Sequence, residues 1–264
     1  MKSKRAKSLQ RVGGKTMLEM ICKTAGSIST KITLIVGFDK NSIINESKSF
    51  DFEISTCEQA SPIGTGDAVK CGINEVDDAD KVLVLYGDVP LIKKETLENL
   101  VSIDDKSLTI LSTKVDNPFG YGRVIKDNDG NVTQIIEEKD ASNADKKISE
   151  IFTGILCCNK VLLAEALKEI KNDNAAGEYY LTDIVSIINK KRFKIKTCVV
   201  PVEEVKGANT KKELSELEET FRKMKSEDLL EMGITVSDPN RVDVRGEVSA
   251  GTDCNIDVNV ILDG

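Results

Sequence analysis

The chain carries short runs of apolar, β-branched residues that alternate with segments in which apolar positions recur every three or four residues. The first pattern is typical of strands buried on both faces, and the second is typical of amphipathic helices. Strands are predicted over residues 31–37, 50–57, 81–88 and 108–115, and helices over 16–25, 39–47, 64–76 and from about residue 94. Strands that alternate with helices in this way predict an α/β fold with a doubly wound, parallel, Rossmann-like sheet.

The middle of the chain departs from this alternation. Residues 124–139 contain Asp127-Asn-Asp-Gly130, a turn signal between two alternating segments, which predicts a β-hairpin. A strand over 148–158, helices over 161–171 and 181–190, and a strand over 193–202 are predicted to follow. We interpret these segments as a β region inserted beside the main sheet, where such folds usually recognise a second substrate.

The last part of the chain changes character again. A charged helix is predicted from residue 209 to about 232, and apolar residues then fall six apart at Val242, Val248, Cys254 and Val260. A six-residue period indicates a β-helix, and chance alternation in a tail is the alternative. We therefore expect an α/β domain over residues 1–233 and the start of an incomplete β-helix over residues 234–264.

Composition excludes several classes of chemistry. The 264 residues include no histidine, which rules out Ser-His-Asp and Cys-His catalysis and histidine-ligated zinc. The net charge of −7 argues against nucleic acid as the main partner, and no apolar run is long enough to predict a membrane span. The seven cysteines form no C-x-x-C pair and are interpreted as buried free thiols in a reducing cytoplasm.

Two segments carry candidate chemistry. Asp88 follows Gly87 at the end of the predicted strand over 81–88, where ligands of open α/β sheets bind. An aspartate there suits Mg²⁺, which takes one or two protein oxygens plus substrate phosphates, although an aspartate that caps a turn is the alternative. Gly64-Thr65-Gly66 opens a predicted helix, where backbone N–H groups bind a phosphate or a base, and an ordinary turn explains it as well.

A series of motifs, taken in order along the chain, points to a known family. The motifs are Val-Gly-Gly-Lys-Thr-Met-Leu (12–18), Gly-Thr-Gly-Asp-Ala (64–68), Leu-Tyr-Gly-Asp-Val-Pro-Leu (85–91), Pro-Phe-Gly-Tyr-Gly-Arg (118–123), Glu-Glu-Lys-Asp-Ala (137–141), Asn-Ala-Ala-Gly-Glu-Tyr-Tyr-Leu-Thr-Asp (174–183) and Val-Lys-Gly-Ala-Asn (205–209). In combination they resemble the bifunctional N-acetylglucosamine-1-phosphate uridylyltransferase / glucosamine-1-phosphate acetyltransferase family of bacterial cell-wall synthesis. The resemblance covers nearly the whole chain, and the tail resembles the first coil of that family's left-handed β-helix.

The resemblance implies that UTP and N-acetylglucosamine 1-phosphate are the substrates and that UDP-N-acetylglucosamine and pyrophosphate are the products. It implies Mg²⁺ as the cofactor and Lys7 and Asp88 as the catalytic residues. This chemistry needs no proton shuttle, since a metal, a lysine and correct positioning carry the transfer. The implied contacts are Lys7 at the phosphates, Asp88 and Asn209 at Mg²⁺, Gln59, Gly64 and Thr65 at the uracil, and Tyr86, Gly87, Gly122 and Glu137 at the sugar nucleotide.

The chain also departs from the family pattern. The family begins with a buried strand and a glycine-rich loop that holds the triphosphate, and Met1 corresponds to the last residue of that loop. Phe152 stands where the family usually has a sugar-contacting Asn, while Gln10, Asp67 and Glu138 stand where relatives often carry histidine. We therefore expect weak activity at best, a missing first strand, and a monomer or weak oligomer, because the trimerising β-helix stops after its first coil. A catalytically inactive sugar-nucleotide-binding or assembly module and a fragment of a longer bifunctional enzyme are the alternatives.

Overall fold

The structure is a computed structural model that describes residues 1, 3–76, 80–102 and 107–263. The chain divides into two compact units. Unit 1 comprises Met1–Ile21, Gly87–Leu91 and Lys206–Gly264, and unit 2 comprises Cys22–Tyr86 and Ile92–Val205. Each unit has its own apolar clusters. The division into a domain of residues 1–233 and a segment of residues 234–264 stays a prediction.

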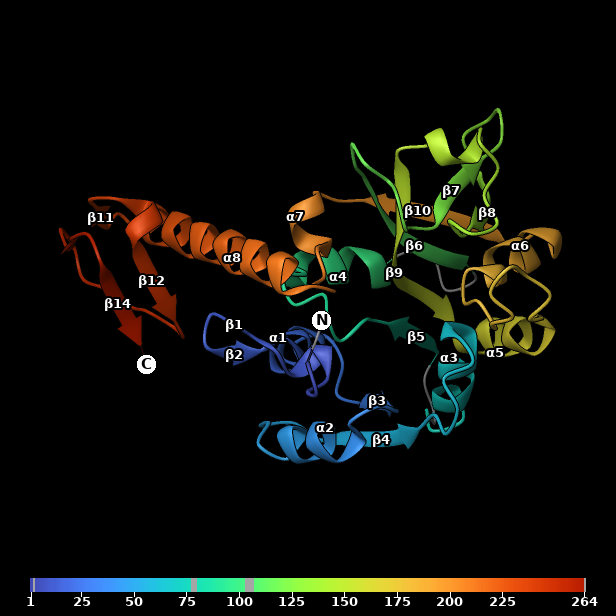
Figure 1. Cartoon of the computed structure of the whole chain (residues 1–264), viewed down its shortest axis with the longest axis horizontal. Helices are drawn as coiled ribbons and strands as arrows, with labels where there is room; N and C mark the ends of the chain where they lie inside the picture. Colours follow the sequence, from blue (N-terminus) through green and yellow to red (C-terminus); the bar gives the residue numbers. More distant parts are fainter. Residues whose placement is uncertain (2, 77–79, 103–106, 264) are drawn as a thin grey trace. The chain divides into compact units, whose positions relative to one another are not determined.

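Unit 2 is built around a six-stranded mixed sheet in the order β10-β6-β9-β7-β8, with β5 paired to β9 (Figure 1). The strands are β5 (Lys81–Val84), β6 (Ser107–Lys114), β7 (Arg123–Lys126), β8 (Val132–Ile136), β9 (Glu150–Asn159) and β10 (Lys194–Val199). β10 runs parallel to β6, whereas β9 runs antiparallel to both β5 and β6. The prediction of a parallel sheet is therefore wrong for β9. The β7–β8 hairpin leads from β6 into β9, and antiparallel neighbours need no helical crossover.

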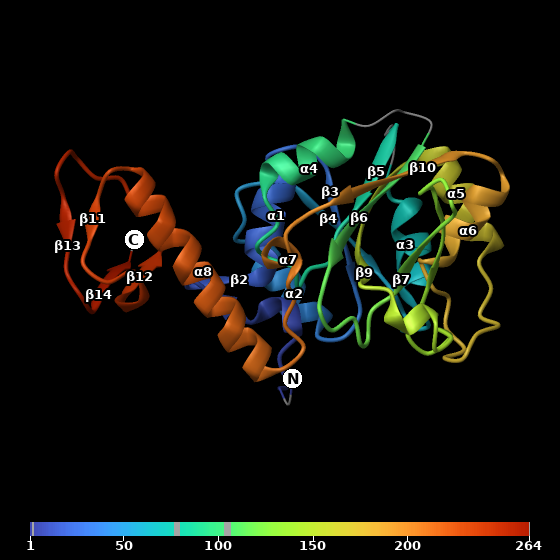
Figure 2. The same ribbon diagram turned by 90° about the horizontal axis from the view of Figure 1, so that it is seen from above.

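Helices cover both faces of this sheet. On one face α3 (Thr65–Ile73), α5 (Lys160–Glu169) and α6 (Asp183–Lys190) enclose the main apolar cluster, to which β6 contributes Leu108 and Ile110. α4 (Lys94–Val101) lies on the opposite face from α5 and α6, with Leu97 and Leu100 fully buried (Figure 2). The remaining short helices are α2 (Lys40–Ser47), α7 (Val202–Val205) and the 3₁₀ turn η2 (Asp145–Lys147). α1 (Met17–Gly26) spans the boundary between the two units.

A second, two-stranded sheet in unit 2 stands apart from the first. β3 (Ile32–Val36) pairs in parallel with β4 (Ile54–Glu58), and among the described strands β3 has no other partner. β5 likewise pairs only with β9 within the described residues. α3 packs on this pair as well, since a Cβ added to Gly72 would lie 2.8 Å from Cδ1 of Ile35. In the part of the chain that the structure describes, one edge of β3 and one edge of β5 therefore have no paired strand.

The N-terminal part of unit 1 is a short 3₁₀ turn, η1 (Lys7–Leu9), followed by a hairpin of β1 (Arg11–Val12) and β2 (Lys15–Thr16). The turn residues Gly13 and Gly14 both have positive φ, +56° and +83°, as a two-residue hairpin loop requires. The hairpin packs on the long helix α8 (Lys211–Glu231), where the Gly13 N–H donates to the Glu218 carboxylate at 3.0 Å. A buried cluster joins these segments and consists of Val12, Met17, Leu91, Ala208 and Leu217.

The C-terminal part of unit 1 contains short parallel pairs. β12 (Val242–Arg245) pairs with β14 (Val260–Asp263), and β11 (Thr235–Val236) pairs with β13 (Asn255–Ile256). The 3₁₀ turn η3 (Pro239–Arg241) precedes β12. Val242 stands directly beside Val260, so two of the four residues predicted by the six-residue period are neighbours across parallel strands.

The boundaries of several elements differ from the prediction. The predicted hairpin over 124–139 is confirmed, with Gly130 at φ +82° in its turn. The strand predicted over 81–88 ends at Val84, because its partner β9 pairs with residues 81–84 only. Tyr86, Gly87 and Asp88 therefore lie in the turn after the strand. No helix within the described residues is both long and apolar enough to span a membrane.

Candidate active site

Three of the predicted site residues meet within unit 1. The Lys7 ammonium donates a hydrogen bond of 2.5 Å to Oδ1 of Asn209. The same ammonium lies close enough to Asp88 for its charge to act on the carboxyl group. A Cβ added to Gly207, two residues before Asn209, would lie 3.0 Å from the backbone oxygen of Asp88. Segments 202 residues apart in sequence are thus brought to one place.

Local structure holds Asn209 in place. Thr210 caps the N-terminus of α8 by accepting a hydrogen bond from the Glu213 N–H at 3.1 Å. The Glu213 carboxylate in turn accepts the Asn209 N–H at 2.6 Å, which is a variant of the capping box. Ala208 is fully buried. Asn209 is therefore fixed between a buried neighbour and a capped helix end.

Burial and charge act in opposite directions on Asp88. Burial raises the pKa of its carboxyl group, and the Lys7 charge and a hydrogen bond from its own backbone N–H lower that pKa. Loss of solvent disfavours the charged form, so an ionised Asp88 needs a nearby cation. Lys7 supplies one in this structure.

The donor set fits a hard divalent cation. Asp88 offers a carboxylate and Asn209 an amide oxygen, which are the donor types that Mg²⁺ takes together with substrate phosphates. Among the residues that the structure describes, no group of three or more His, Cys, Asp or Glu side chains is placed to hold a metal by itself. A metal at Asp88 and Asn209 would therefore depend on oxygens from substrate or water.

The predicted uracil contacts lie in unit 2, where a turn is joined to a distant loop. The Gly66 N–H donates to the Tyr179 oxygen at 2.8 Å, and the Tyr179 N–H donates to the Ile63 oxygen at 2.8 Å. Gly64 has φ +132°, and a Cβ there would overlap the Tyr179 backbone. Thr65 Oγ1 accepts the N–H of Leu181 at 3.1 Å. The 64–68 and 174–183 motifs are thus neighbours in space.

Gln59 belongs to the same turn. Its side-chain amide donates to the Gly64 oxygen at 3.1 Å and to the Asp67 carboxylate at 2.8 Å. Its own N–H donates to the Val36 oxygen at 2.8 Å, which extends the β3–β4 pairing by one residue. The sequence did not mark Asp67 as a site residue, since a contact to Gln59 eight positions away has no local signature.

Three further predicted residues lie around β7–β9 or after β5. Glu137 accepts a hydrogen bond of 3.0 Å from the Thr182 hydroxyl, and Gly122 lies beside it, since an added Cβ would be at the ordinary contact distance of 3.5 Å from Glu137 Oε1. Burial raises the pKa of Glu137 most, and the charges of neighbouring acids add to this while the Thr182 hydrogen bond opposes it. The ring of Tyr86 lies against Gly154, at φ +86°, where any Cβ would collide with it.

Two other positions complete the comparison with the prediction. Gly87 belongs to unit 1, where an added Cβ would lie 3.4 Å from Cβ of Ser8. Phe152 is buried in the main cluster of unit 2, and its N–H donates to the Gly122 oxygen at 2.9 Å. The structure therefore assembles one group of predicted residues in unit 1 and another in unit 2.

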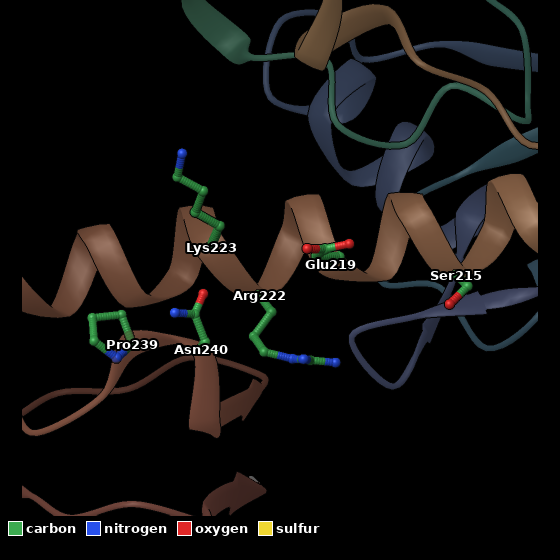
Figure 3. Close-up of a pocket in the computed structure, with 6 residues that line it drawn as sticks. All are labelled: Ser215, Glu219, Arg222, Lys223, Pro239 and Asn240. Atoms are coloured by element: carbon green, nitrogen blue, oxygen red, sulfur yellow. The ribbon is translucent and has the colours of Figure 1, made fainter.

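A hollow of about 220 Å³ lies elsewhere in unit 1, beside α8 (Figure 3). Arg222 points toward β12 and pairs with Asp243 at 3.4 Å, whereas Lys223 points away from Asn240 (Figure 3). The hollow contains none of the predicted site residues, and its lining mixes acidic, basic and neutral groups: Ser215, Glu219, Arg222, Lys223, Pro239 and Asn240.

The fold of a mixed sheet with helices on both faces also occurs in other solved structures. It is similar to a nucleoside-diphosphate-sugar pyrophosphorylase from Vibrio cholerae RC9 (TM-score 0.64, 16% identity, covering 82% of this chain and 93% of that one). It is also similar to HddC from Yersinia pseudotuberculosis (TM-score 0.59, 18% identity, covering 84% of this chain and 92% of that one). Residues 1–147 match the family model of the MobA-like NTP transferase domain, and the chain belongs to this family.

Comparison with curated sequence relatives gives matches of higher identity. The protein named Bifunctional protein GlmU from Psychrobacter sp. (strain PRwf-1) is 40% identical over 266 residues, which cover 100% of this chain and 58% of that protein. The protein of the same name from Methylococcus capsulatus is 41% identical over 268 residues, with the same coverage of 100% and 58%. The chain thus spans somewhat more than half the length of these curated relatives.

Proposed function

We propose that the chain is a sugar-1-phosphate nucleotidyltransferase that forms UDP-N-acetylglucosamine and pyrophosphate from UTP and N-acetylglucosamine 1-phosphate. The observation that carries this proposal is the grouping of Lys7, Asp88 and Asn209 within unit 1. The motifs that resemble the uridylyltransferase family supply the choice of substrates. The 40% identity to the GlmU protein from Psychrobacter supports that choice.

The reaction is a displacement at phosphorus. An oxygen of the sugar phosphate attacks the α-phosphorus of UTP, and the bond from that phosphorus to the α–β bridging oxygen breaks. Pyrophosphate leaves with the electron pair of that bond. The attacking phosphate is already largely ionised near neutral pH, so no side chain has to remove a proton. A chain without histidine is therefore suited to this chemistry.

The side chains of unit 1 have two tasks in this reaction. Lys7 binds phosphate oxygens through its ammonium, and Asp88 and Asn209 hold Mg²⁺. When bound, Mg²⁺ neutralises charge on the phosphate oxygens and helps to align them. The helix cap that fixes Asn209 and the close approach of Gly207 to Asp88 support this assignment, because the ligands are held before substrate arrives.

We assign the remaining predicted residues to the base and the sugar of the substrates. We assign Gln59, Gly64 and Thr65 to the uracil, because backbone groups of their turn are fixed by Tyr179 and Leu181. We assign a further set to the sugar nucleotide, since Thr182 orients the carboxylate of Glu137 beside Gly122. This set consists of Tyr86, Gly87, Gly122 and Glu137.

We extend the proposal to the finer organisation of the chain. The open edges of β3 and β5 support a place for one further strand between them, which is the first strand of the family fold. The parallel β12–β14 and β11–β13 pairs support residues 234–264 as the start of a left-handed β-helix after a nucleotidyltransferase domain of residues 1–233.

Seven free cysteines support a location in the reducing cytoplasm.

Pyrophosphate release tests the proposed function. The purified chain is incubated with Mg²⁺, each of the four common nucleoside triphosphates and a panel of sugar 1-phosphates. Release is expected only when UTP, N-acetylglucosamine 1-phosphate and Mg²⁺ are all present. A preference for another nucleotide or sugar would refute the substrate assignment. Binding of UDP-N-acetylglucosamine without any turnover would favour the inactive binding module instead.

A further inference from the structure

The Lys7 ammonium interacts with both side chains that we assign as metal ligands, Asn209 and Asp88. Lys7 donates its 2.5 Å hydrogen bond to the Asn209 amide oxygen, and its charge acts on Asp88. Asn209 is held by the capped end of α8, and Asp88 lies in contact range of Gly207. Lys7 is itself exposed and sits on a long, flexible stem. Of the three groups, only the Lys7 ammonium is free to move far.

We propose that Lys7 occupies the cation position at Asp88 and Asn209 while nucleotide is absent, and that a divalent cation competes with it for Asn209 Oδ1. This inference rests on the proposed function, because it takes Asp88 and Asn209 as the cation ligands. The ammonium keeps the half-buried carboxylate of Asp88 compensated in the free protein. Entry of the divalent cation displaces the ammonium, since two cations at one oxygen repel each other strongly.

Nucleotide changes the outcome of this competition. The phosphates of UTP give the displaced ammonium a new partner of opposite charge. The cost of moving Lys7 is then offset, so nucleotide and metal each strengthen the binding of the other. Such coupling is reciprocal for binding free energies. Metal therefore binds weakly to the free protein and more tightly once nucleotide is present.

The test measures Mn²⁺ binding directly, by the electron paramagnetic resonance signal of free Mn²⁺. Lys7→Met removes the ammonium and keeps the length of the stem. Without nucleotide, this variant is expected to bind Mn²⁺ about tenfold more tightly than the unmodified chain, because a charge-assisted hydrogen bond no longer has to be broken. With UTP, the advantage is expected to disappear, since the variant has also lost its phosphate contact.

Three further variants make the result specific. Lys211→Met removes a nearby charge whose ammonium contacts the Gln10 amide oxygen, and it is expected to change Mn²⁺ affinity less than about twofold. Lys7→Gln is a second removal of the Lys7 charge, in case the methionine variant folds poorly. Asp88→Ala is expected to abolish Mn²⁺ binding, both in the unmodified chain and in combination with either Lys7 substitution. Circular dichroism confirms that each variant is folded.

The outcomes separate this inference from the proposed function. If Asp88→Ala abolishes Mn²⁺ binding but both Lys7 variants keep the original affinity, the competition is refuted and the metal assignment stands. The same holds if Lys211→Met tightens binding as much as Lys7→Met does, because the effect is then one of general charge. If Mn²⁺ binds equally well to Asp88→Ala, or binds to none of the variants, both the ligand assignment and the competition are wrong.

Discussion

The turn at Gly64 gives a prediction whose size follows from the structure. Gly64→Ala places a methyl group in a backbone conformation of φ +132° and against the backbone of Tyr179, whose nitrogen would be 2.6 Å away. The unfavourable φ costs about 1–3 kcal/mol. The collision costs about another 1–3 kcal/mol, because the neighbour is backbone and cannot turn aside. The expected loss of unfolding free energy is therefore about 4 kcal/mol.

Gly120→Ala is the matched control. Gly120 also has positive φ, +87°, but an added Cβ there would meet nothing within 4 Å. Only the conformational cost of about 1–2 kcal/mol applies. Urea unfolding followed by circular dichroism is expected to separate the two variants by about 2 kcal/mol. Equal losses for the two variants would refute the close approach of the 64–68 and 174–183 motifs.

Three other predictions follow from the structure. Asp88→Asn is expected to lower the rate of pyrophosphate release by at least about 10²-fold without loss of unfolding free energy, because the neutral amide is easier to bury; unchanged turnover would contradict the catalytic assignment. Burial raises the pKa of Cys22 and Cys158 from 9.0 to about 12, so folded thiols keep protons that unfolded thiols lose. Unfolding free energy is therefore expected to fall as pH rises from 9 toward 12, and less steeply in Cys22→Ala; identical slopes would contradict this. Amide protons of β3 and β5 are expected to exchange faster than those of β6, which is paired on both sides, and equal protection would show that the open edges are covered.

Local patterns predicted the elements of the fold well and their directions less well. The structure confirms the predicted β7–β8 hairpin. The prediction succeeded because the turn signal lies within four consecutive residues, Asp127 to Gly130. The antiparallel direction of β9 depends on how the chain enters that strand, and no periodicity within β9 encodes this. The early end of β5 at Val84 has the same origin, since it is set by the length of its pairing with β9.

Local sequence patterns also did not predict which residues of the candidate site contact one another. The resemblance implied roles for Gly64 and Glu137. However, Tyr179, whose backbone lies against Gly64, and Thr182, which donates to Glu137, are tens of residues or more away along the chain. Only tertiary structure brings such pairs together. The capping box that fixes Asn209 was readable, because Thr210 and Glu213 have the spacing that signals a helix start.

Asp67 and Glu138 stand at positions where the family resemblance implies histidine in relatives. Asp67 accepts the Gln59 amide at 2.8 Å, and Glu138 pairs with the buried Arg123 at 2.6 Å. Both acidic side chains have a specific partner within unit 2, and both contacts hold neighbouring segments together.

In the proposed reaction, the sugar phosphate attacks the α-phosphorus of UTP. N-acetylglucosamine 1-phosphate labelled with oxygen-18 in its non-bridging phosphate oxygens, reacted with unlabelled UTP and followed by mass spectrometry, tests this directly. If the sugar phosphate is the nucleophile, UDP-N-acetylglucosamine is expected to carry all of the label and pyrophosphate none. Label in pyrophosphate, or cleavage of UTP without incorporation of the sugar phosphate, would contradict it.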